Sequence, residues 1–382
     1  MTTPLSTKDI LAQLQSTADG PLTRATSAHP QLYRDAGIAA LEHDRIWAQD
    51  WLCPGMAAEI PKPGDYITYT IGDDPVFITR GQDGTIRTFS NICRHRMMVM
   101  LQGSGNAGKV VCPYHAWTYD LQGNLRGAGH MERSDGFDKK DHCLPQIRTE
   151  VWQGWIYITL NQDAAPVADN LAALNPLVDQ FKLDHYIPVS TQDHLWDTNW
   201  KLLTENFMES YHLPTAHKAT LGGWLPLDTV EFPDEVHDAF TFQIFEKLPD
   251  STYGVAHKDN THLQGRWRHT SVMPTVFPSH MYVLAPDHCW YLSLRPHGVG
   301  QVHVRFGVAI APEVHAEFEG PERDAWMADL NHFFDHVNEE DRTVVEGIYA
   351  GSGAGLAAPG NLSWLEREIH DFQKYLSGRL AG

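Results

Sequence analysis

The chain contains few cysteines, no long apolar run and a shortage of basic residues. Its five cysteines are spread over 382 residues, and this odd, sparse set does not suit a disulfide framework. No apolar stretch reaches the roughly 20 residues that a membrane helix needs. Residues 1–20 are polar and lack the charged-then-apolar pattern of a signal peptide. These absences predict a soluble cytoplasmic protein without a membrane partner.

Acidic residues outnumber basic ones by 48 to 29, which gives a formal net charge of −19. The phosphates of nucleic acids demand a basic surface, so this charge argues against a nucleic-acid partner. It is compatible with a basic redox partner or a cationic substrate. At 382 residues and 42% hydrophobic content, we expect two domains or one large elaborated one.

Short strands and helices follow one another in two blocks. Strands bounded by Gly, Pro, Asn and Asp are expected at residues 65–72, 75–81, 85–91, 109–115, 117–125 and 154–160. Helical spacing at 171–181 and 199–212 is followed by strands at 240–248, 280–286, 289–298 and 301–310, and by helices at 322–351 and 362–376. We predict an α+β protein, with a small antiparallel β domain at 45–160 and an antiparallel sheet with helices at 161–382.

Two Cys/His pairs lie in the first block. Cys93-x-His95 and Cys112-x-x-His115 are separated by sixteen residues, each after an expected strand. Four such ligands could hold one zinc ion or a two-iron cluster. Zinc modules usually group cysteines together and histidines together, whereas these mixed pairs let each loop give one thiolate to one iron and one imidazole to the other. The order therefore favours a two-iron cluster.

The loop between these pairs contains GSGNAG, residues 103–108, which matches the nucleotide-binding pattern GxGxxG. No helical pattern follows it, so we interpret it as a flexible turn. The chain also has no Cys-x4-Cys-x2-Cys run and no second glycine-rich fingerprint. A fused ferredoxin or flavin reductase is not expected, and electrons must come from another protein.

A second constellation lies at residues 199–217. Glu209 and His212 are three residues apart, on one face of an expected helix, and His217 follows beyond Pro214. Because proline discourages helix at the residue before it, His217 is expected to turn back and face the same point as His212. Two histidines need a carboxylate to complete the facial triad of oxygen-activating iron.

The carboxylate can be sought on the expected helix at residues 322–349. Asp341 occupies the one polar position of an apolar stripe, where a bare carboxylate would carry a large desolvation cost that a metal could offset. Its neighbours Glu339 and Glu340 fall off the stripe and are interpreted as solvated charges. The apolar members of the stripe are Trp326, Leu330, Phe333, Val337, Val344 and Ile348.

These residues carry a resemblance to the Rieske oxygenases. NICRHR (91–96) and CPYHAWTYDLQGNL (112–125) resemble the Rieske domain, in which two cysteines bind one iron of a [2Fe-2S] cluster and two histidines bind the other. The sequence departs from that pattern at Met97, where a glycine often follows the arginine, and at Ala116, which replaces the usual glycine. ENFMESYHLPTAH (205–217) and EEDRTVVEG (339–347) resemble the catalytic domain of the demethylating branch.

The resemblance implies a role for each site residue. Cys93, His95, Cys112 and His115 would bind the cluster, and His212, His217 and Asp341 would bind mononuclear Fe(II). Glu209 would be the bridging acid that connects the iron site to the Rieske histidine of a neighbouring subunit, which implies a homotrimer. It also implies a helix-grip type catalytic domain at 161–382, with a helical segment at 1–44 packing on it. Glutamate at the bridging position is frequent in enzymes acting on quaternary ammonium compounds.

The implied function is that of a terminal oxygenase component, a monooxygenase or demethylase. It would use O2 and electrons from a separate reductase of the flavin or ferredoxin type, fed by NAD(P)H, to hydroxylate a small substrate. Hydroxylation of an N-methyl group of a betaine-like compound would give a carbinolamine that collapses to formaldehyde and the demethylated amine.

Several alternatives stay open. Within enzymes, the chain could be an aromatic-ring hydroxylase or an O-demethylase of a methoxylated aromatic acid. An electron-transfer Rieske protein would need residues 50–160 alone, and a zinc-stabilised binding module is a further candidate. The sequence names neither the substrate nor the reductase. Aromatic residues that could form a cage for a trimethylammonium group, or stack on a ring, are Trp196, Trp200, Trp224, Trp267, Trp290, Tyr211, Tyr253, Tyr282 and Tyr291.

Overall fold

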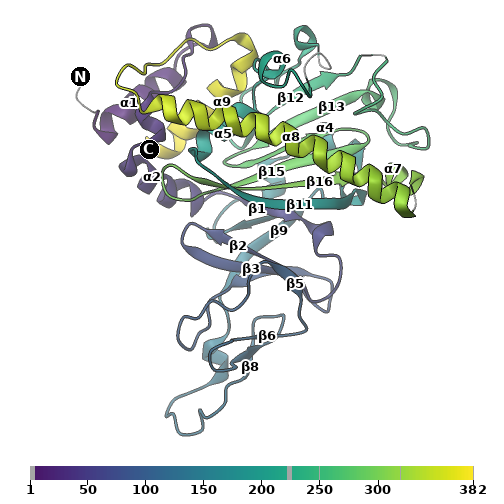
Figure 1. Ribbon diagram of the computed structural model, residues 1–382. Helices are drawn as coiled ribbons and strands as arrows, with labels where there is room; N and C mark the ends of the chain where they lie inside the picture. The colour runs from purple at the N-terminus through teal and green to yellow at the C-terminus, as the bar shows by residue number, and fades with distance from the viewer. Residues whose placement is uncertain (1–4, 222–225, 249, 319, 382) are drawn as a thin grey trace. The chain divides into compact units, whose positions relative to one another are not determined.

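The computed structural model describes residues 5–221, 226–248, 250–318 and 320–381 (Figure 1). The chain divides into two compact units. One is Trp47–Val167, and the other joins Met1–Ile46 to Ala168–Gly382. Within the described ranges, no helix combines the length and the apolar character that crossing a bilayer would require.

The unit Trp47–Val167 is built on antiparallel strands. Seven form a sheet in the order β1-β10-β9-β4-β3-β2-β5, and three form a small sheet in the order β6-β7-β8. The strands are β1 (Leu52–Met56), β2 (Asp65–Ile71), β3 (Asp74–Arg80), β4 (Ile86–Ser90), β5 (Ser104–Asn106), β6 (Val110–Val111), β7 (Thr118–Tyr119), β8 (Leu125–Gly127), β9 (Gln146–Trp152) and β10 (Trp155–Thr159).

The interpretation of residues 103–108 as a flexible turn was wrong for the middle of the segment. Ser104–Asn106 forms strand β5, which pairs with β2 at the edge of the seven-stranded sheet. Gly105 lies against the ring of Tyr66, and a Cβ atom there would be 3.0 Å from the Tyr66 hydroxyl oxygen. Glycine at this position allows the close strand pairing, which the nucleotide-like pattern conceals.

The second unit contains a six-stranded antiparallel sheet in the order β11-β16-β15-β14-β13-β12. The sequence patterns missed β11 and β13, which interrupt their apolar residues with proline, serine and threonine. The strands are β11 (Ile187–Trp196), β12 (Phe240–Glu246), β13 (Thr270–Val276), β14 (His280–Leu284), β15 (His288–Pro296) and β16 (Val302–Ile310).

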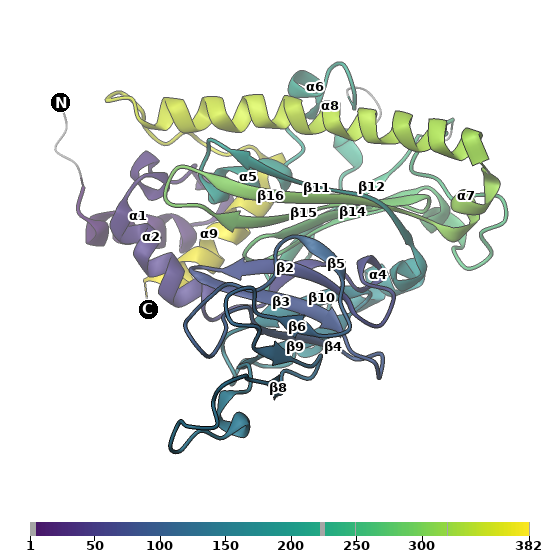
Figure 2. The same ribbon diagram turned by 60° about the horizontal axis from the view of Figure 1, so that its bottom comes forward.

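Helices surround this sheet, and the longest, α8 (Gly320–Ser352), runs across one side of it (Figure 2). The combination of a separate β unit with a sheet-and-helix unit confirms the predicted α+β fold class. The other α-helices are α1 (Thr7–Ala18), α2 (Ala36–Glu42), α3 (Val167–Asn170), α4 (Asn175–Val178), α5 (Trp200–Phe207), α6 (Leu213–Ala216), α7 (Pro312–Glu317) and α9 (Arg367–Leu380).

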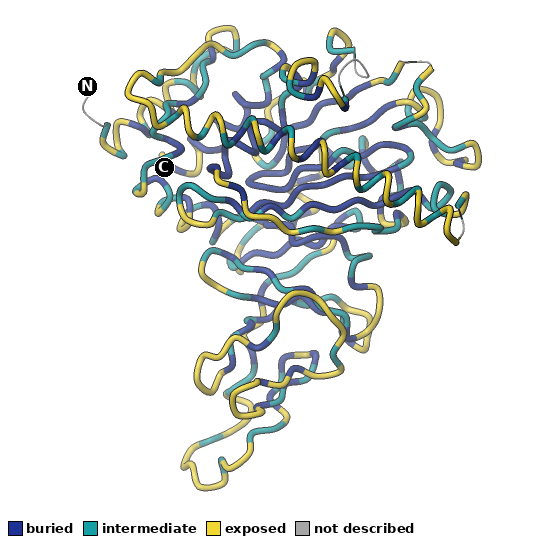
Figure 3. The backbone as a smooth tube through the Cα atoms, in the orientation of Figure 1, coloured by how far each residue is buried: buried dark blue, intermediate teal, exposed yellow. Residues whose placement is uncertain are grey.

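The middle of the six-stranded sheet is buried (Figure 3), and its register decides which side chains face α8. Phe245 of β12 is paired with Ser271 of β13, and Trp290 of β15 is paired with Val283 of β14. Directly paired residues of an antiparallel sheet point to the same face. These four side chains line one cavity together with Phe334 of α8, so the cavity lies between the sheet and α8.

The buried face of α8 is rotated by about one residue from the predicted stripe. Its buried residues are Phe334, Val337, Asn338, Asp341 and Val345, whereas Ile348 is 46% exposed. The pairs Phe333/Phe334 and Val344/Val345 made both faces apolar in the sequence, so the period of 3.6 residues did not distinguish them. Val337 and Asp341 belong to both patterns.

Helix α5 is fixed by buried ionic and polar contacts. All eight of its residues are buried. Lys201 forms a 2.6 Å ion pair with Glu42 of α2, and the indole N–H of Trp200 donates to the same carboxylate at 2.8 Å. The hydroxyl of Tyr33 donates to Glu205 at 2.8 Å. Because each buried charge has a partner, α5 is held in one orientation, and so is the turn that follows it.

Candidate functional site

The two Cys/His pairs lie in loops of the same design. In the first loop, the N–H of Cys93 donates to the carbonyl of Met98, and the N–H of Met97 donates to the carbonyl of Cys93. In the second loop, Cys112 N–H donates to the Trp117 carbonyl, and Ala116 N–H donates to the Cys112 carbonyl. Each cysteine is therefore the first residue of a hydrogen-bonded turn. The two turns have the same size, and each contains one histidine.

The departures at Met97 and Ala116 fall at equivalent positions of these turns. Their φ angles are 55° and 57°, in the left-handed region that glycine adopts at no steric cost. Other side chains are strained there by about 1–2 kcal/mol. The usual glycine at these positions is therefore explained by the positive φ angle of the turn, and this chain adopts the same turn with Met97 and Ala116.

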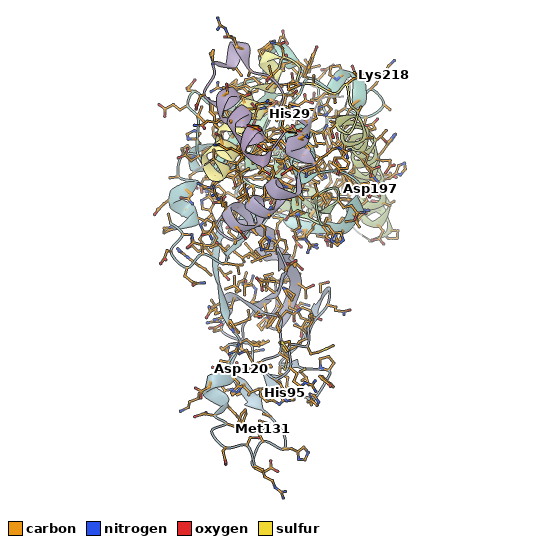
Figure 4. All side chains as sticks on the ribbon, turned by 90° about the vertical axis from the view of Figure 1, so that its left-hand side faces the viewer. His29, His95, Asp120, Met131, Asp197 and Lys218 are labelled. Carbon is orange, nitrogen blue, oxygen red and sulfur yellow. The ribbon has the colours of Figure 1, made fainter. Side chains whose placement is uncertain are left out.

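The two loops place the two histidines next to each other and the two cysteines next to each other. The Nδ1 atoms of His95 and His115 are 3.1 Å apart, and both imidazoles are exposed. The Cys93 and Cys112 thiols are buried, and burial and then the Cys93 thiol raise the pKa of Cys112. In this unit, His95 lies at the same end as Asp120 and Met131 (Figure 4). Two thiols inside and two imidazoles outside suit a cluster whose irons take different ligands.

The second constellation lies in a turn, so the prediction that Glu209 and His212 share a helix face was wrong. Helix α5 ends at Phe207, and α6 begins at Leu213 with Pro214 in its first turn. Proline is tolerated there because the first N–H groups of a helix have no intrahelical partner. The break in the helix was expected at Leu213, but it comprises residues 208–212, because Leu213 is already the first residue of α6.

The turn brings His212, His217 and Asp341 together. The Nε2 atoms of His212 and His217 lie 3.6 Å and 3.1 Å from Asp341 Oδ1. One ligand atom of each residue lies within 4.8 Å of the other two. The three predicted iron ligands are thus gathered around one point, at the mouth of the turn and on the buried face of α8.

Each histidine is oriented by a glutamate behind it. Glu209 Oε1 is 2.5 Å from His212 Nδ1, and Glu340 Oε2 is 2.8 Å from His217 Nδ1. A carboxylate accepts, so each Nδ1 carries a hydrogen and each Nε2 atom faces Asp341. This is the usual second contact of a metal-binding histidine, where a carboxylate fixes the ring and raises its basicity.

Glu340 was wrongly interpreted as a solvated charge. Its side chain is 14% exposed, and Thr220 donates to the same oxygen at 2.5 Å. Burial raises the pKa of Glu340, but hydrogen bonds from Thr220 and His217 outweigh it, so the net pKa is lowered. The rotated face of α8 explains the error, because Glu340 turns toward the site with Asp341.

The electrostatics of this group favour a cation. Asp341 Oδ1 is buried and has no well-aligned hydrogen bond from any described residue. Burial lowers the pKa of His217, but Asp341 and then Glu340 outweigh it and raise the pKa to about 9. Two imidazoles and one carboxylate around one point suit a divalent iron with open positions. The residues therefore fit the metal that the resemblance implies.

The triad opens into the cavity between α8 and the sheet. Of the nine aromatic residues proposed for a cage, Tyr253 and Trp290 line it. Trp224 lies outside the described residues, and Tyr211 is 60% exposed. The aromatic residues proposed for a cage from the sequence were all tryptophans and tyrosines, so they included no phenylalanine. The aromatic lining also includes Phe207, Phe245 and Phe334.

Glu209 also lines a second cavity, which has a volume of about 360 Å³. Glu205 and Glu366 line it as well, so three carboxyl groups gather there. Burial raises the pKa of Glu205 to about 7, although the hydrogen bond from Tyr33 and the charge of Lys201 lower it. The Glu209 side chain thus stands between the triad and an acidic cavity of the same unit.

Both constellations lie within regions that match known protein families. Residues 180–382 match the family described as ring hydroxylating alpha subunit (catalytic domain), and residues 50–147 match the Rieske [2Fe-2S] domain. The oxygenase subunit of glycine betaine monooxygenase from Pseudomonas aeruginosa is 30% identical over 363 residues, which cover 87% of this chain and 83% of that protein.

Two further likenesses differ in extent. The corresponding subunit from Chromohalobacter salexigens is 36% identical over 202 residues, which cover 53% of this chain and 45% of that protein, less than half of its length. A solved structure of a quaternary ammonium Rieske monooxygenase that oxidises carnitine has a TM-score of 0.82 at 22% identity. It covers 99% of this chain and 100% of that one, which shows the shared fold.

The turn geometry predicts that Ala116→Gly stabilises the unit Trp47–Val167. Relief of left-handed strain, about 1–2 kcal/mol, exceeds the entropy that glycine costs, about 0.5–1 kcal/mol. We expect the free energy of unfolding to rise by about 0.5–1 kcal/mol in urea titrations followed by visible absorption. Ala57→Gly, at a position without positive φ, is the control and should lower it. A loss of stability in Ala116→Gly would contradict the strain argument.

The contact between Glu340 and His217 predicts a metal-affinity effect. Glu340→Ala removes the group that orients this imidazole, and such losses lower metal affinity by roughly 10-fold to 100-fold. Iron content after dialysis against a chelator measures the effect, while the visible spectrum of the other centre should be unchanged. The neighbouring exposed Glu339 provides the control Glu339→Ala. Equal iron retention in both variants would show that Glu340 does not support the site.

Proposed function

Since this chain belongs to the family of Rieske-type ring-hydroxylating oxygenases, we propose that it is the terminal oxygenase that N-demethylates a betaine-like quaternary ammonium compound. A Rieske oxygenase of this family carries a [2Fe-2S] cluster and a mononuclear iron. We assign Cys93, His95, Cys112 and His115 to the cluster, and His212, His217 and Asp341 to the mononuclear iron. When bound, these groups supply single electrons and activate O2 for attack on a C–H bond.

The residues of the chain bind and orient the substrate. The observation that carries the proposal is that the triad opens into a cavity with five aromatic side chains and the carboxylates of Glu209 and Asp341. Aromatic faces and carboxylates both attract a quaternary ammonium group. The relatives from Pseudomonas and Chromohalobacter, named for glycine betaine, support the same substrate class.

Electrons are proposed to come from a separate reductase that draws on NAD(P)H in the cytoplasm. The exposed imidazoles of His95 and His115 support delivery through the histidine side of the cluster. In a proposed homotrimer, the histidine side of one subunit's cluster would face Glu209 of the next subunit. The position of Glu209 between the triad and the acidic cavity supports this bridging role.

A single-turnover experiment tests the proposed function. The purified protein is reduced chemically without a reductase and mixed with O2 and a panel of glycine betaine, carnitine, γ-butyrobetaine and methoxylated aromatic acids, and products are identified by mass. We expect formaldehyde and a demethylated betaine. A demethylated methoxy acid would assign the aromatic alternative instead, and cluster oxidation without any product would place the substrate outside the panel.

The bridging role of Glu209 makes a separate prediction. Glu209→Gln keeps a group of the same size, so both metals should be retained, but it removes the carboxylate that connects the two centres. We expect steady-state turnover to fall by about 100-fold, which is the upper end of the loss in activity when a group next to a metal ligand is changed. Product formation per cluster oxidised, measured in the same mixtures, should fall with it. Unchanged turnover would exclude the bridging role.

A further inference from the structure

The cavity that contains the triad has a polar region formed by the sheet. Lys247, Ser271 and His288 line it together with the triad and the aromatic residues. Among the described lining residues, Lys247 is the one lysine or arginine. The function proposed above uses none of these three side chains.

Strand register turns Lys247 and Ser271 to the same face. Phe245 of β12 is paired directly with Ser271 of β13. Lys247 lies two residues after Phe245, and its N–H still donates to the carbonyl of His269 at 2.7 Å. Side chains two residues apart in an extended strand share a face. Both residues therefore line the cavity from the same face of the sheet.

Both groups have unused hydrogen-bonding capacity. Ser271 is 1% exposed, and its hydroxyl has no hydrogen-bond partner among the described residues. Lys247 is partly buried, and the charge of Asp287 acts on it. Burial lowers the pKa of Lys247 to about 8, which leaves it mostly protonated near neutral pH. A desolvated ammonium and an unpaired hydroxyl are costly unless an anion joins them.

The nearby acid and imidazole are already engaged. Asp287 accepts from His288 Nδ1 at 2.6 Å and from the N–H of Gly254 at 2.8 Å. His288 Nε2 is 2.9 Å from the hydroxyl of Tyr253. Asp287, which raises the pKa of Lys247, does not line the cavity of the triad among the described residues. Lys247 and Ser271 are thus the donors left for a ligand.

The opposite charges lie at the triad. Glu209 and Asp341 are the carboxylates among the described lining residues, and both belong to the metal site. A bound Fe(II) would offset the charge of Asp341, so Glu209 is the carboxylate that attracts a trimethylammonium group at this end, whereas a substrate carboxylate is attracted by Lys247. The cavity therefore has one orientation for a molecule that carries both charges.

We propose that Lys247 and Ser271 form a carboxylate-binding subsite, which selects zwitterionic betaines and directs their N-methyl groups toward His212, His217 and Asp341. This assignment rests on the proposed function and deepens it. It makes the carboxylate of the substrate a determinant of both affinity and orientation, and it separates betaines from quaternary amines that lack an acid group.

Matched ligand pairs test the subsite. Dissociation constants are measured by calorimetry on the iron-loaded protein without O2, for γ-butyrobetaine against butyltrimethylammonium and for glycine betaine against tetramethylammonium. Removing one partner of a desolvated charge pair weakens binding by roughly 30-fold to 4,000-fold. We expect this loss in Lys247→Met for the carboxylate-bearing ligands, with a change below about 3-fold for their carboxylate-free partners.

Further variants separate charge from structure. Lys247→Arg should keep most of the affinity, and Ser271→Ala should weaken the betaines by roughly 10-fold because one hydrogen bond to a charged group is lost. Lys258→Met, on an exposed lysine in the following loop, is the control and should change neither ligand class. An equal loss for both members of each pair would indicate a structural role and overturn the subsite.

The outcomes also distinguish the two levels of the proposal. If the natural chain binds and demethylates a betaine while Lys247→Met binds it equally well, the subsite is wrong and the function stands. If the natural chain neither binds nor demethylates any betaine, the proposed function fails and the subsite assignment fails with it.

Discussion

The organisation of the second unit depends on one buried carboxylate. Asp341 lies on the face of α8 that packs toward the sheet, and its Oδ1 is the common neighbour of His212 and His217. A carboxylate in such a place is costly unless a positive charge accompanies it. The long helix, the turn after α5 and the two glutamates behind the imidazoles all position groups around this oxygen. The burial that makes the Asp341 carboxylate unfavourable without a cation also favours the binding of a metal ion by it.

The two proposed metal sites are assembled in different ways. The Cys/His loops are closed by backbone hydrogen bonds into two equivalent turns, which keep their shape with Met97 and Ala116 where glycine would relieve strain. The triad is assembled from side chains of distant elements, with Glu209 and Glu340 orienting one imidazole each. Local turns can be recognised from a short motif, whereas assembled contacts cannot.

This difference explains how much the sequence could predict. The ligand pairs, the α+β class and the proximity of His212, His217 and Asp341 were accessible from spacing and resemblance. Glu340 was not, because α8 is apolar on two adjacent faces and its rotation is set by packing against the sheet. Strands β11 and β13 were missed because proline, serine and threonine interrupt the alternation of apolar and polar residues in them. The polar end of the cavity depends on strand register, which no local pattern at Lys247 reveals.

The cavity joins these features into one chemical environment. Its carboxylates are Glu209 and Asp341, its walls are aromatic and apolar, and its one lysine among the described lining residues directly follows strand β12. We propose that this arrangement of charge orients a small zwitterion, so that specificity comes from residues of the sheet and reactivity from the turn and α8.

Iron analysis shows whether Asp341 binds a metal. Metal content and the visible spectrum are measured on the natural chain and on Asp341→Ala. We expect three irons per chain in the natural protein and two in the variant, with the spectrum of the cluster unchanged, because that variant removes a ligand of the mononuclear site alone. The same iron content in both proteins would contradict the assignment of Asp341 and of the site built around it.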